Sequence, residues 1–391
     1  MFGTSSGAAA VHNRRVVIDA IRINGALSRA DLARATRLAK QTLSNIIDEL
    51  ERDGLVVARD TVKEGRGKPA TPYDLAPFGA FSIGLQIDRH LARTVVMNLV
   101  GDIVLRRDLK FLPSEPEAGL GSLIQLISQT RAVLAEIYPL SETRTVGLGV
   151  AMPGPFGLST QDRSADDYTM ARWQGVHLVE RLAAATGLMV NVQNDASAAA
   201  TAEKMTGKAH GMQNAICLYL GYGLGAGLIL NRELFGGRNG NAGEIGMIRG
   251  LGGTDRGVLM ERSLALGGFC ERFGLSHSDE RLFERIEALL NEASPAVDEW
   301  LNSAAYRLGW LAEMLQLIVD PEAIILCGTA PSKLIEAIVS RANSALDDDL
   351  SGGRRLPLLA GHSDPWIVAI GAAAEPISRS FDPKYDAILK V

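Results

Sequence analysis

The sequence predicts a multidomain chain of the α+β and α/β classes, in which a small helical head precedes a larger α/β body. Three observations lead to this expectation. The chain has 391 residues, enough for two or three domains of ordinary size. Residues 1–75 show helical periodicity and hold twelve Lys/Arg against nine Asp/Glu, in a chain whose net charge is −5. From Phe81 onward strands alternate with helices, which is typical of α/β domains.

The composition is that of an ordinary globular protein, with 47% apolar and 22% charged residues. This excludes a disordered, collagen-like or coiled-coil chain. The longest apolar stretch is interrupted by Glu313 and Gln316, so we expect no membrane span. The N-terminus lacks the apolar core of a secretory signal, and Cys217, Cys270 and Cys327 are too widely spaced for a disulfide scaffold. We therefore expect a cytoplasmic protein with reduced thiols.

Residues 1–76 are expected to form the head. Apolar residues at helical spacing predict a first helix over 11–24, and the ten residues before it are expected to be disordered. Ser28, with Asp31 three residues later, forms a capping pattern for a second helix. The apolar side chains of a third helix recur at i, i+3, i+4 and i+7, at Leu43, Ile46, Ile47 and Leu50.

The third helix carries a polar face whose side chains can reach base edges and phosphates. After it, two short strand-like segments flank 65–69 and place two basic residues at the tip of a loop. Together these features favour a winged helix-turn-helix that binds DNA; the alternative is a trihelical protein-binding module. The candidate DNA-binding residues are Arg29, Lys40, Gln41, Thr42, Ser44, Asn45, Arg66 and Lys68.

Residues 77–391 are expected to form the body, with a second lobe that begins near 195–215. In an α/β architecture ligands bind at the carboxyl ends of strands. Helices are expected at 120–138 and 176–186 and directly after Asp195, and further helices reach Ser380. Strands are expected at 81–88, 93–99, 102–105, 145–151, 189–193, 215–220, 228–230 and 323–327.

A glycine-rich segment, 221–227, follows one of these strands. Its backbone could approach a phosphate. It matches neither the Rossmann pattern, which needs glycine where Ala226 stands, nor a P-loop. A tight hairpin between two buried strands explains the same glycines equally well, so the segment alone does not indicate nucleotide binding.

Taken together, these segments resemble the repressor branch of the ROK family (repressors, open reading frames and sugar kinases), over nearly the whole chain. The segments LSRADLARATRLAKQTLSNIIDELERDGLV and GRGKP look like its operator-binding module. The segments VAMPGP, NDASAAA, LGYGLGAGLIL, GRNGNAGEIG and LMERS look like successive family motifs. The resemblance implies a two-lobed, actin-like (ribonuclease H-like) ATPase-fold ROK domain that binds a sugar in its cleft.

The resemblance also implies the sugar-binding residues, which are Asn194, Asp195, Glu244 and Glu261. Carboxylates and an amide can each hold two neighbouring sugar hydroxyls. In the family's kinases the residue that matches Asp195 is the general base; no catalytic residue is assigned here. The structural alternatives are a helix N-cap for Asp195 and a loop ion pair for Glu244.

The zinc loop of the family is lost. Its ligands, one His and three Cys, correspond here to Met247, Gly252, Thr254 and Leu259. None of these side chains offers an imidazole or a thiolate, so we expect no zinc, no other metal and no cofactor. The missing histidine is also a sugar ligand in the family, so Met247 removes one basis of the family's hexose specificity.

The phosphate loop of the family's kinases, Asp-x-Gly-Gly-Thr, is also absent. Here the segment is 88–92, where His90 and Leu91 would obstruct close approach of a phosphate to the backbone. The Gly-Gly pair on the adenosine side corresponds to Gly328–Thr329. We therefore expect no phosphorylation and no enzyme activity.

The sequence thus predicts a transcriptional repressor of carbohydrate genes that binds operator DNA and a small-molecule sugar effector. We expect a homodimer or a dimer of dimers, without contact to a membrane. An ATP-dependent sugar kinase with an added head is the alternative, and a repressor whose body responds to a protein partner is a third reading. The histidines without a partnering motif are expected to be structural: His177, His210, His277 and His362.

Overall fold

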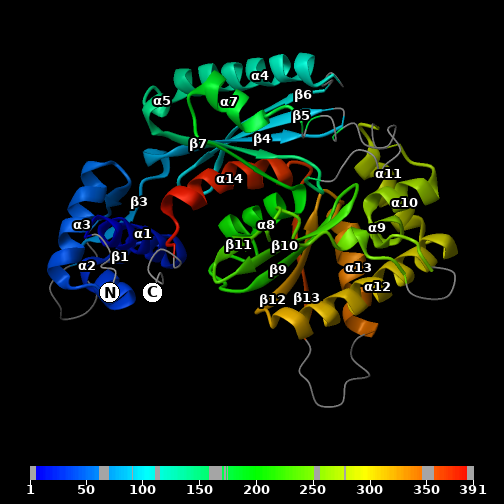
Figure 1. Cartoon of the computed structure of the whole chain (residues 1–391). Coiled ribbons are helices and arrows are strands. Elements are labelled where there is room, and N and C mark those ends of the chain that lie inside the picture. Colours follow the sequence, from blue (N-terminus) through cyan, green and yellow to red (C-terminus); the bar gives the residue numbers. More distant parts are fainter. Residues whose placement is uncertain are drawn as a thin grey trace.

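A computed structural model of the chain describes residues 6–60, 70–89, 91–110, 115–157, 170, 173, 175–250, 256–276, 279–345 and 356–384. It shows a small N-terminal head beside two larger lobes (Figure 1). Helices α8 (Asp195–Thr206) and α14 (Ile367–Phe381) lie between the sheets of the two lobes. No helix in the described ranges is both long and apolar enough to cross a membrane.

The head is the predicted winged helix-turn-helix. The four apolar positions of its third helix are buried in a core shared with the first two helices, as their spacing predicts. The hydroxyl of Ser28 accepts a hydrogen bond from the Asp31 amide at 3.2 Å and caps the second helix. The elements are α1 (Ser6–Asn24), α2 (Arg29–Thr36), α3 (Lys40–Arg52), β1 (Leu27–Ser28), β2 (Val56–Ala58) and β3 (Pro72–Leu75), with sheet order β1-β3-β2.

Two expectations for the head were wrong in detail. Helix α1 begins at Ser6, so residues 6–10 are not disordered; the alanines at 8–10 are strong helix formers and extend the helix toward the N-terminus. Strand β1 was not expected, because two residues carry no periodicity; it exists through antiparallel pairing of Leu27 with Tyr73.

The first lobe is a five-stranded sheet with order β6-β5-β4-β7-β8. Its central strand β4 is buried at every position, because α14 covers one face of the sheet and the core with α4 and α7 covers the other. The elements are η1 (Pro77–Gly79), β4 (Phe81–Ile87), β5 (Ala92–Asn98), β6 (Ile103–Leu109), α4 (Pro116–Ile137), α5 (Ser141–Arg144), β7 (Thr145–Ala151), α7 (Leu178–Thr186) and β8 (Val190–Gln193).

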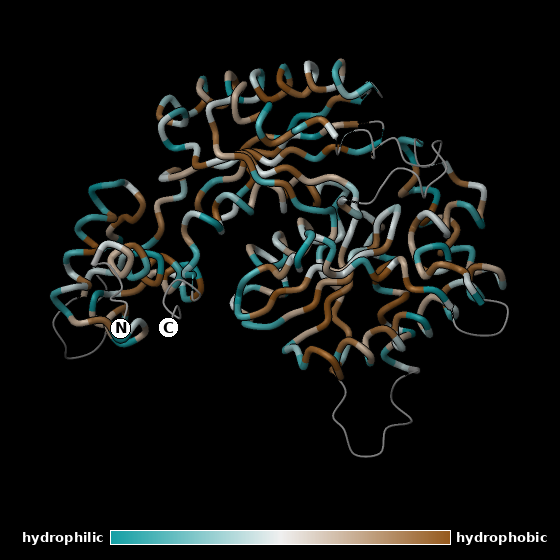
Figure 2. The backbone as a smooth tube through the Cα atoms, in the orientation of Figure 1, coloured by the Kyte–Doolittle hydropathy of each residue, from teal (hydrophilic) through white to brown (hydrophobic). Residues whose placement is uncertain are grey.

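The second lobe repeats the same strand order, β11-β10-β9-β12-β13. Figure 2 shows strands of both sheets as hydrophobic, brown tubes. This repeated topology is the two-lobed fold that the resemblance implied. The elements are β9 (Ala215–Leu220), β10 (Leu224–Leu230), β11 (Glu233–Phe235), η3 (Ile245–Met247), α9 (Met260–Leu264), α10 (Leu266–Phe273), α11 (Leu282–Glu292), α12 (Pro295–Val319), β12 (Ala323–Gly328), α13 (Ser332–Ala345) and β13 (Leu358–Ser363).

Three strands of the second lobe differ from the expectation. Strand β11 was not expected and is held by antiparallel pairing with β10. Strand β10 begins at Leu224, which pairs antiparallel with Leu220, so the glycine-rich segment is a tight hairpin. Strand β13 was not expected, because after Leu359 its residues are Ala, Gly, His and Ser. It is held by parallel pairing with β12 and by the carboxylate of Glu203, which accepts a hydrogen bond from the His362 amide at 2.5 Å.

Helices α8 and α14 approach each other very closely. A side chain at Gly371 of α14 would overlap the carbonyl oxygen of Ala198 on α8, so glycine is required at this crossing. Helix α14 packs on the sheet of the first lobe and α8 on that of the second. Helix α14, the last helix in the described residues, therefore returns to the first lobe, and the two lobes meet through this helix pair.

Candidate functional site

The polar face of α3 is accessible in the head. The side chains of Lys40, Gln41, Thr42 and Asn45 are exposed and Ser44 is half-buried. Gln41 donates a hydrogen bond to Asn45 at 3.1 Å. Four of the predicted DNA-binding side chains therefore lie on one open helix surface.

Arg29, the first residue of α2, is half-buried and engaged in contacts within the head. Its guanidinium donates hydrogen bonds to Asp48 at 2.5 Å and to the hydroxyl of Tyr73 at 3.1 Å, and it also contacts the Ser44 hydroxyl. It thus ties α3 to β3 and fixes the angle of the helix. A direct contact of Arg29 with DNA remains a prediction.

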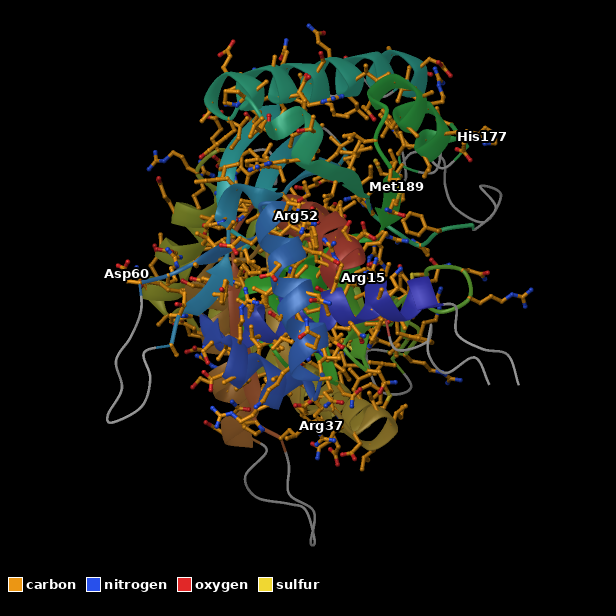
Figure 3. The ribbon with its side chains drawn as sticks, turned by 90° about the vertical axis from the view of Figure 1, so that its left-hand side faces the viewer. Arg15, Arg37, Arg52, Asp60, His177 and Met189 are labelled. Carbon is orange, nitrogen blue, oxygen red and sulfur yellow. The ribbon has the colours of Figure 1, made fainter. Side chains whose placement is uncertain are left out.

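The other two predicted basic residues, Arg66 and Lys68, lie outside the described residues. Sequence reasoning did not include Arg37, an exposed residue in the turn between α2 and α3 with φ 57°. Figure 3 shows it at the lower end of the head. Its position in the break between two helices was the available signal.

In the body, Asn194 and Glu244 are in direct contact. The Asn194 side chain accepts a hydrogen bond from the Ser197 amide at 2.7 Å and donates one to Glu244 Oε1 at 3.3 Å. The N-cap of α8 is therefore Asn194, and the structural alternative of Asp195 as N-cap is wrong. Both residues are good caps, and the helix begins at Asp195, one residue earlier than an Asp195 cap would require.

Asp195 is the first residue of α8, and its Oδ1 is buried without a hydrogen-bond partner among the described residues. Burial raises the pKa of this carboxyl well above its ordinary value, and the carboxylates of Asp88 and Glu244 raise it further, while Arg89 opposes them. A buried acceptor without a donor is unfavourable. Hydroxyl groups of a bound sugar could supply the missing donors.

Gly154, after strand β7, lies against Glu244. A side chain at this position would overlap Glu244 Oε1, so a glycine in the VAMPGP segment allows the loop to approach the carboxylate. Glu261, on α9, lies beside the segment that follows Glu244, since a methyl group at Gly246 would be 3.2 Å from its Oε2. The structure thus brings Asn194, Asp195 and Glu244 together and places Glu261 next to them.

Arg89 adds a contact that the sequence did not indicate. It follows β4 of the first lobe, and its guanidinium lies 4.4 Å from the ring centroid of Tyr222 in the β9–β10 turn of the second lobe. The segment 88–92 is where the kinases carry glycines. An arginine in this segment thus makes a cation–π contact across the two lobes.

The positions of the lost zinc loop offer no ligands where they are described. Met247 is 37% exposed and Leu259 pairs with Arg249 in a short bridge, while Gly252 and Thr254 lie outside the described residues. Among the residues that the structure describes, no group of three or more His, Cys, Asp or Glu side chains could hold a metal ion. The absence of zinc stays a prediction.

Comparisons with known proteins match two family models to separate parts of the chain. The ROK family model matches residues 82–374, and the MarR family model matches residues 16–67. A putative xylose repressor of Caldicellulosiruptor sp. (strain Rt8B.4) is 26% identical over 238 residues, which are 60% of this chain and 57% of that protein. A beta-glucoside kinase of Listeria monocytogenes is 32% identical over 150 residues, 37% of this chain and 45% of that protein.

A solved structure of a ROK family transcriptional regulator, a homologue of the E. coli MLC protein, has a similar fold. It has a TM-score of 0.71 and 23% identity, and the match covers 96% of this chain and 98% of that one. Because the family model spans well over half of the sequence, from the first strand of the body to its last helix, this chain belongs to the ROK family.

Proposed function

We propose that this protein is a sugar-responsive transcriptional repressor of carbohydrate genes. One observation carries the proposal: a winged helix-turn-helix with an exposed polar α3 face is joined to a body whose interlobe residues hold a buried carboxyl oxygen without a donor. The xylose repressors among the relatives support this reading. A repressor of this kind works beside the chromosome, so we propose a cytoplasmic location.

On the DNA side, we propose that α3 enters the major groove of an operator. Lys40 and the amides of Gln41 and Asn45 are the side chains that can read base edges there. Each good bidentate contact to a base discriminates by about 1–3 kcal/mol. Substitution of Asn45 should therefore change operator preference, whereas loss of a phosphate contact should weaken binding to all sequences equally.

On the ligand side, we propose that Asn194, Asp195, Glu244 and Glu261 bind a neutral sugar. An amide and three carboxylates are acceptor-rich and suit a row of hydroxyl donors. D-xylose is the first ligand to test, because repressors of that name are among the relatives. By linkage, a sugar that weakens operator binding must bind the DNA-free protein more tightly, by the same factor.

We propose further that the protein does not transfer phosphate from ATP. Arg89 contacts Tyr222 in the segment where the family's kinases have glycines, and the glycine-rich segment 221–227 is a hairpin. The second candidate is an ATP-dependent sugar kinase, favoured by the match to a beta-glucoside kinase and by Asp195 at the position of the kinase base. ATP consumption in the presence of a sugar panel distinguishes the two.

A repressor that reads a two-fold operator needs a second copy of the chain. We propose that the outer face of α12 forms this contact, in a homodimer or a dimer of dimers. Tyr306, Trp310 and Leu317 are 75%, 43% and 78% exposed, and their i, i+4, i+11 spacing puts them on one face of the helix. Exposed apolar side chains gathered in one stripe mark an interaction surface.

Operator selection tests the function. The purified protein is bound to fragmented genomic DNA of its source, and the best fragment is titrated with D-xylose and a panel of other sugars. A two-fold site whose affinity shifts with one sugar supports the proposal, and Glu244→Ala should then keep operator affinity and lose the response. Specific binding that no sugar changes would point to a protein partner, and the absence of specific binding would favour the kinase.

A further inference from the structure

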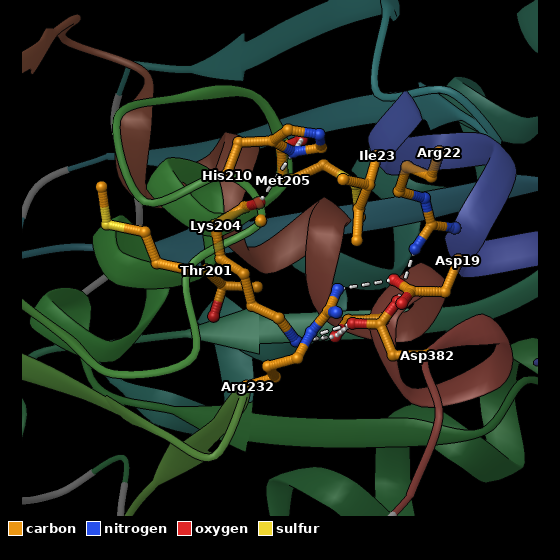
Figure 4. A pocket seen from close by; sticks show the side chains of 12 residues that line it. Asp19, Arg22, Ile23, Thr201, Lys204, Met205, His210, Arg232 and Asp382 are labelled. Atoms are coloured by element: carbon orange, nitrogen blue, oxygen red, sulfur yellow. Dashed lines mark hydrogen bonds and ion pairs between the residues drawn. The ribbon is translucent and has the colours of Figure 1, made fainter. Parts of the chain in front are cut away.

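A buried cluster of charged side chains joins the head to both lobes. Figure 4 shows it in a pocket where α1 meets the ends of α8 and α14. Asp19 pairs with Arg232 at 2.9 Å, Arg22 pairs with Asp382, and Lys204 pairs with Asp382 at 2.6 Å. The side chains are only 8% to 21% exposed, so these pairs differ from the solvent-exposed pairs elsewhere on the surface.

The partners come from three different parts of the molecule. Asp19 and Arg22 lie on α1 of the head. Arg232 lies in the turn between β10 and β11 of the second lobe, and Asp382 directly follows α14, which packs on the first lobe. Helix α1 is therefore bound to the second lobe through one ion pair and to the first lobe through the other.

Helix α8 connects this cluster to the sugar site. It begins at Asn194 and Asp195, the candidate ligand residues, and carries Lys204 in its last turn. Nine residues of helix span about 14 Å. A displacement at the first turn of a rigid helix is therefore delivered to Lys204, and through Asp382 to Arg22 of the head.

Burial makes these pairs sensitive to geometry. A charge that loses its partner in a buried position is strongly unfavourable, far more so than at the surface. Burial and the nearby Asp382 already raise the pKa of Asp19, and Arg232 opposes this. Because one pair reaches Arg232 of the second lobe and the other reaches Asp382 after α14, a rotation of the lobes against each other would change the geometry of at least one of them.

We infer that this cluster is the coupling element that transmits effector binding from the interlobe site to the DNA-binding head. The inference rests on the proposed function, and it adds residues that neither the DNA face nor the sugar site contains. Lys204 and Arg232 are positioning residues, since they touch neither DNA nor sugar.

The test uses two variants, Lys204→Met and the double variant Asp19→Asn/Arg232→Gln. The double variant replaces an ion pair by a neutral polar pair of similar size, so it is expected to fold. Arg379→Met is the matched control, because it removes an exposed arginine of α14 that pairs with Glu375. Operator affinity is measured with and without D-xylose or, if the wild type does not respond to it, the panel sugar that shifts its affinity. Sugar affinity is measured by calorimetry.

We expect both variants to bind operator and sugar within about threefold of wild type, while the sugar changes their operator affinity by less than twofold. Arg379→Met should respond like the wild type. A variant response equal to that of the wild type overturns the inference. Reciprocity supplies a second readout, because an uncoupled variant must also lose the effect of operator DNA on sugar affinity.

If the wild type itself binds no operator or no sugar, the proposed function fails. A measurement without ligands then tests whether the charged cluster holds the head against the second lobe. Spin labels at Glu51→Cys on α3 and Glu271→Cys on α10 report the distance between head and second lobe. The native cysteines are buried, so labelling is confined to the new sites. The double variant should broaden this distance distribution. An unchanged distribution would show that the charged cluster does not hold the head in place, and it would overturn the inference.

Discussion

Replacing Asp195 by asparagine should stabilise the ligand-free protein and weaken sugar binding. The carboxyl of Asp195 has a buried oxygen without a described partner and lies near the carboxylates of Asp88 and Glu244. Asparagine has nearly the same shape and carries no charge. The substitution therefore removes the cost of burying the charge and the repulsion from the two neighbouring acids.

The magnitude follows from removal of the charge: the variant gains about 1.4 kcal/mol for each pH unit by which the folded-state pKa of Asp195 exceeds its unfolded-state value. The sign with pH follows from linkage: the folded-state pKa of Asp195 is raised, so ionisation opposes folding. Below an unfolded-state pKa of about 3.9 the aspartate is neutral in both states and the variant gains nothing. The gain grows as the pH rises from there and reaches its full value above the raised folded-state pKa.

Thermal unfolding of wild type and variant at pH 5 and pH 8 measures this difference. We expect a higher midpoint for the variant, by roughly 2–4 °C for each kcal/mol, with the larger gain at pH 8. Asp60→Asn, at an exposed position of the head, is the matched control and should change little. A destabilised variant, or a gain that is equal at both pH values, would refute the assignment of a strained buried charge.

The same substitution should weaken sugar binding about 10- to 100-fold, because a hydrogen bond to a charged group contributes about 1.5–3 kcal/mol. Calorimetric titration measures this loss. Opposite effects on stability and affinity are the signature of a residue kept for its ligand. A purely structural residue would lose stability when it is replaced.

Three further predictions concern packing, an ion pair and the surface. Gly371→Ala should destabilise by about 1–3 kcal/mol or more in thermal unfolding, because it forces α8 and α14 apart; Gly121→Ala, in open space on α4, should not. The carboxylate of Glu203, whose Oε1 lies 3.3 Å from His362 Nδ1, raises the pKa of His362, so the pair stabilises below about pH 6.5 and its contribution is lost as the pH rises through the raised value. His362→Gln should therefore cost stability at pH 6 and little at pH 9. Trp310→Glu should shift the light-scattering mass from dimer to monomer, and an unchanged mass would exclude the α12 face.

The parts of the fold that could be predicted have local signals. The buried positions of α3 follow from their spacing, whereas Asn194 and Asp195 were indicated by the resemblance of their segment to a family motif. Strand β13 could not be predicted in this way, because its stability comes from parallel pairing with β12 and from Glu203 on a distant helix. Asn194 and Asp195 are both favourable N-cap residues, and residue propensities do not decide which of two neighbours caps the helix.

The buried cluster of charged side chains between the head and the lobes could not be predicted from the sequence. Asp19 and Arg232 are separated by 213 residues, and Lys204 and Asp382 by 178 residues. Each of these side chains looks like an ordinary solvated charge in the sequence. Contacts of this range depend on how the head and the two lobes are assembled, which no local pattern records.

Helix α8 combines the two features that a ligand-driven switch requires. Its first turn holds a buried acid that lacks a donor, and its last turn holds an ion pair that connects to the head. A ligand can shift a conformational equilibrium only by its differential affinity for the two states. The cost of leaving Asp195 unsatisfied, about 1–3 kcal/mol, sets the scale of what a sugar can gain by satisfying it in one state. That range corresponds to an allosteric coupling of about 5- to 150-fold, so a sugar that satisfies Asp195 in one state only would produce a response of this size.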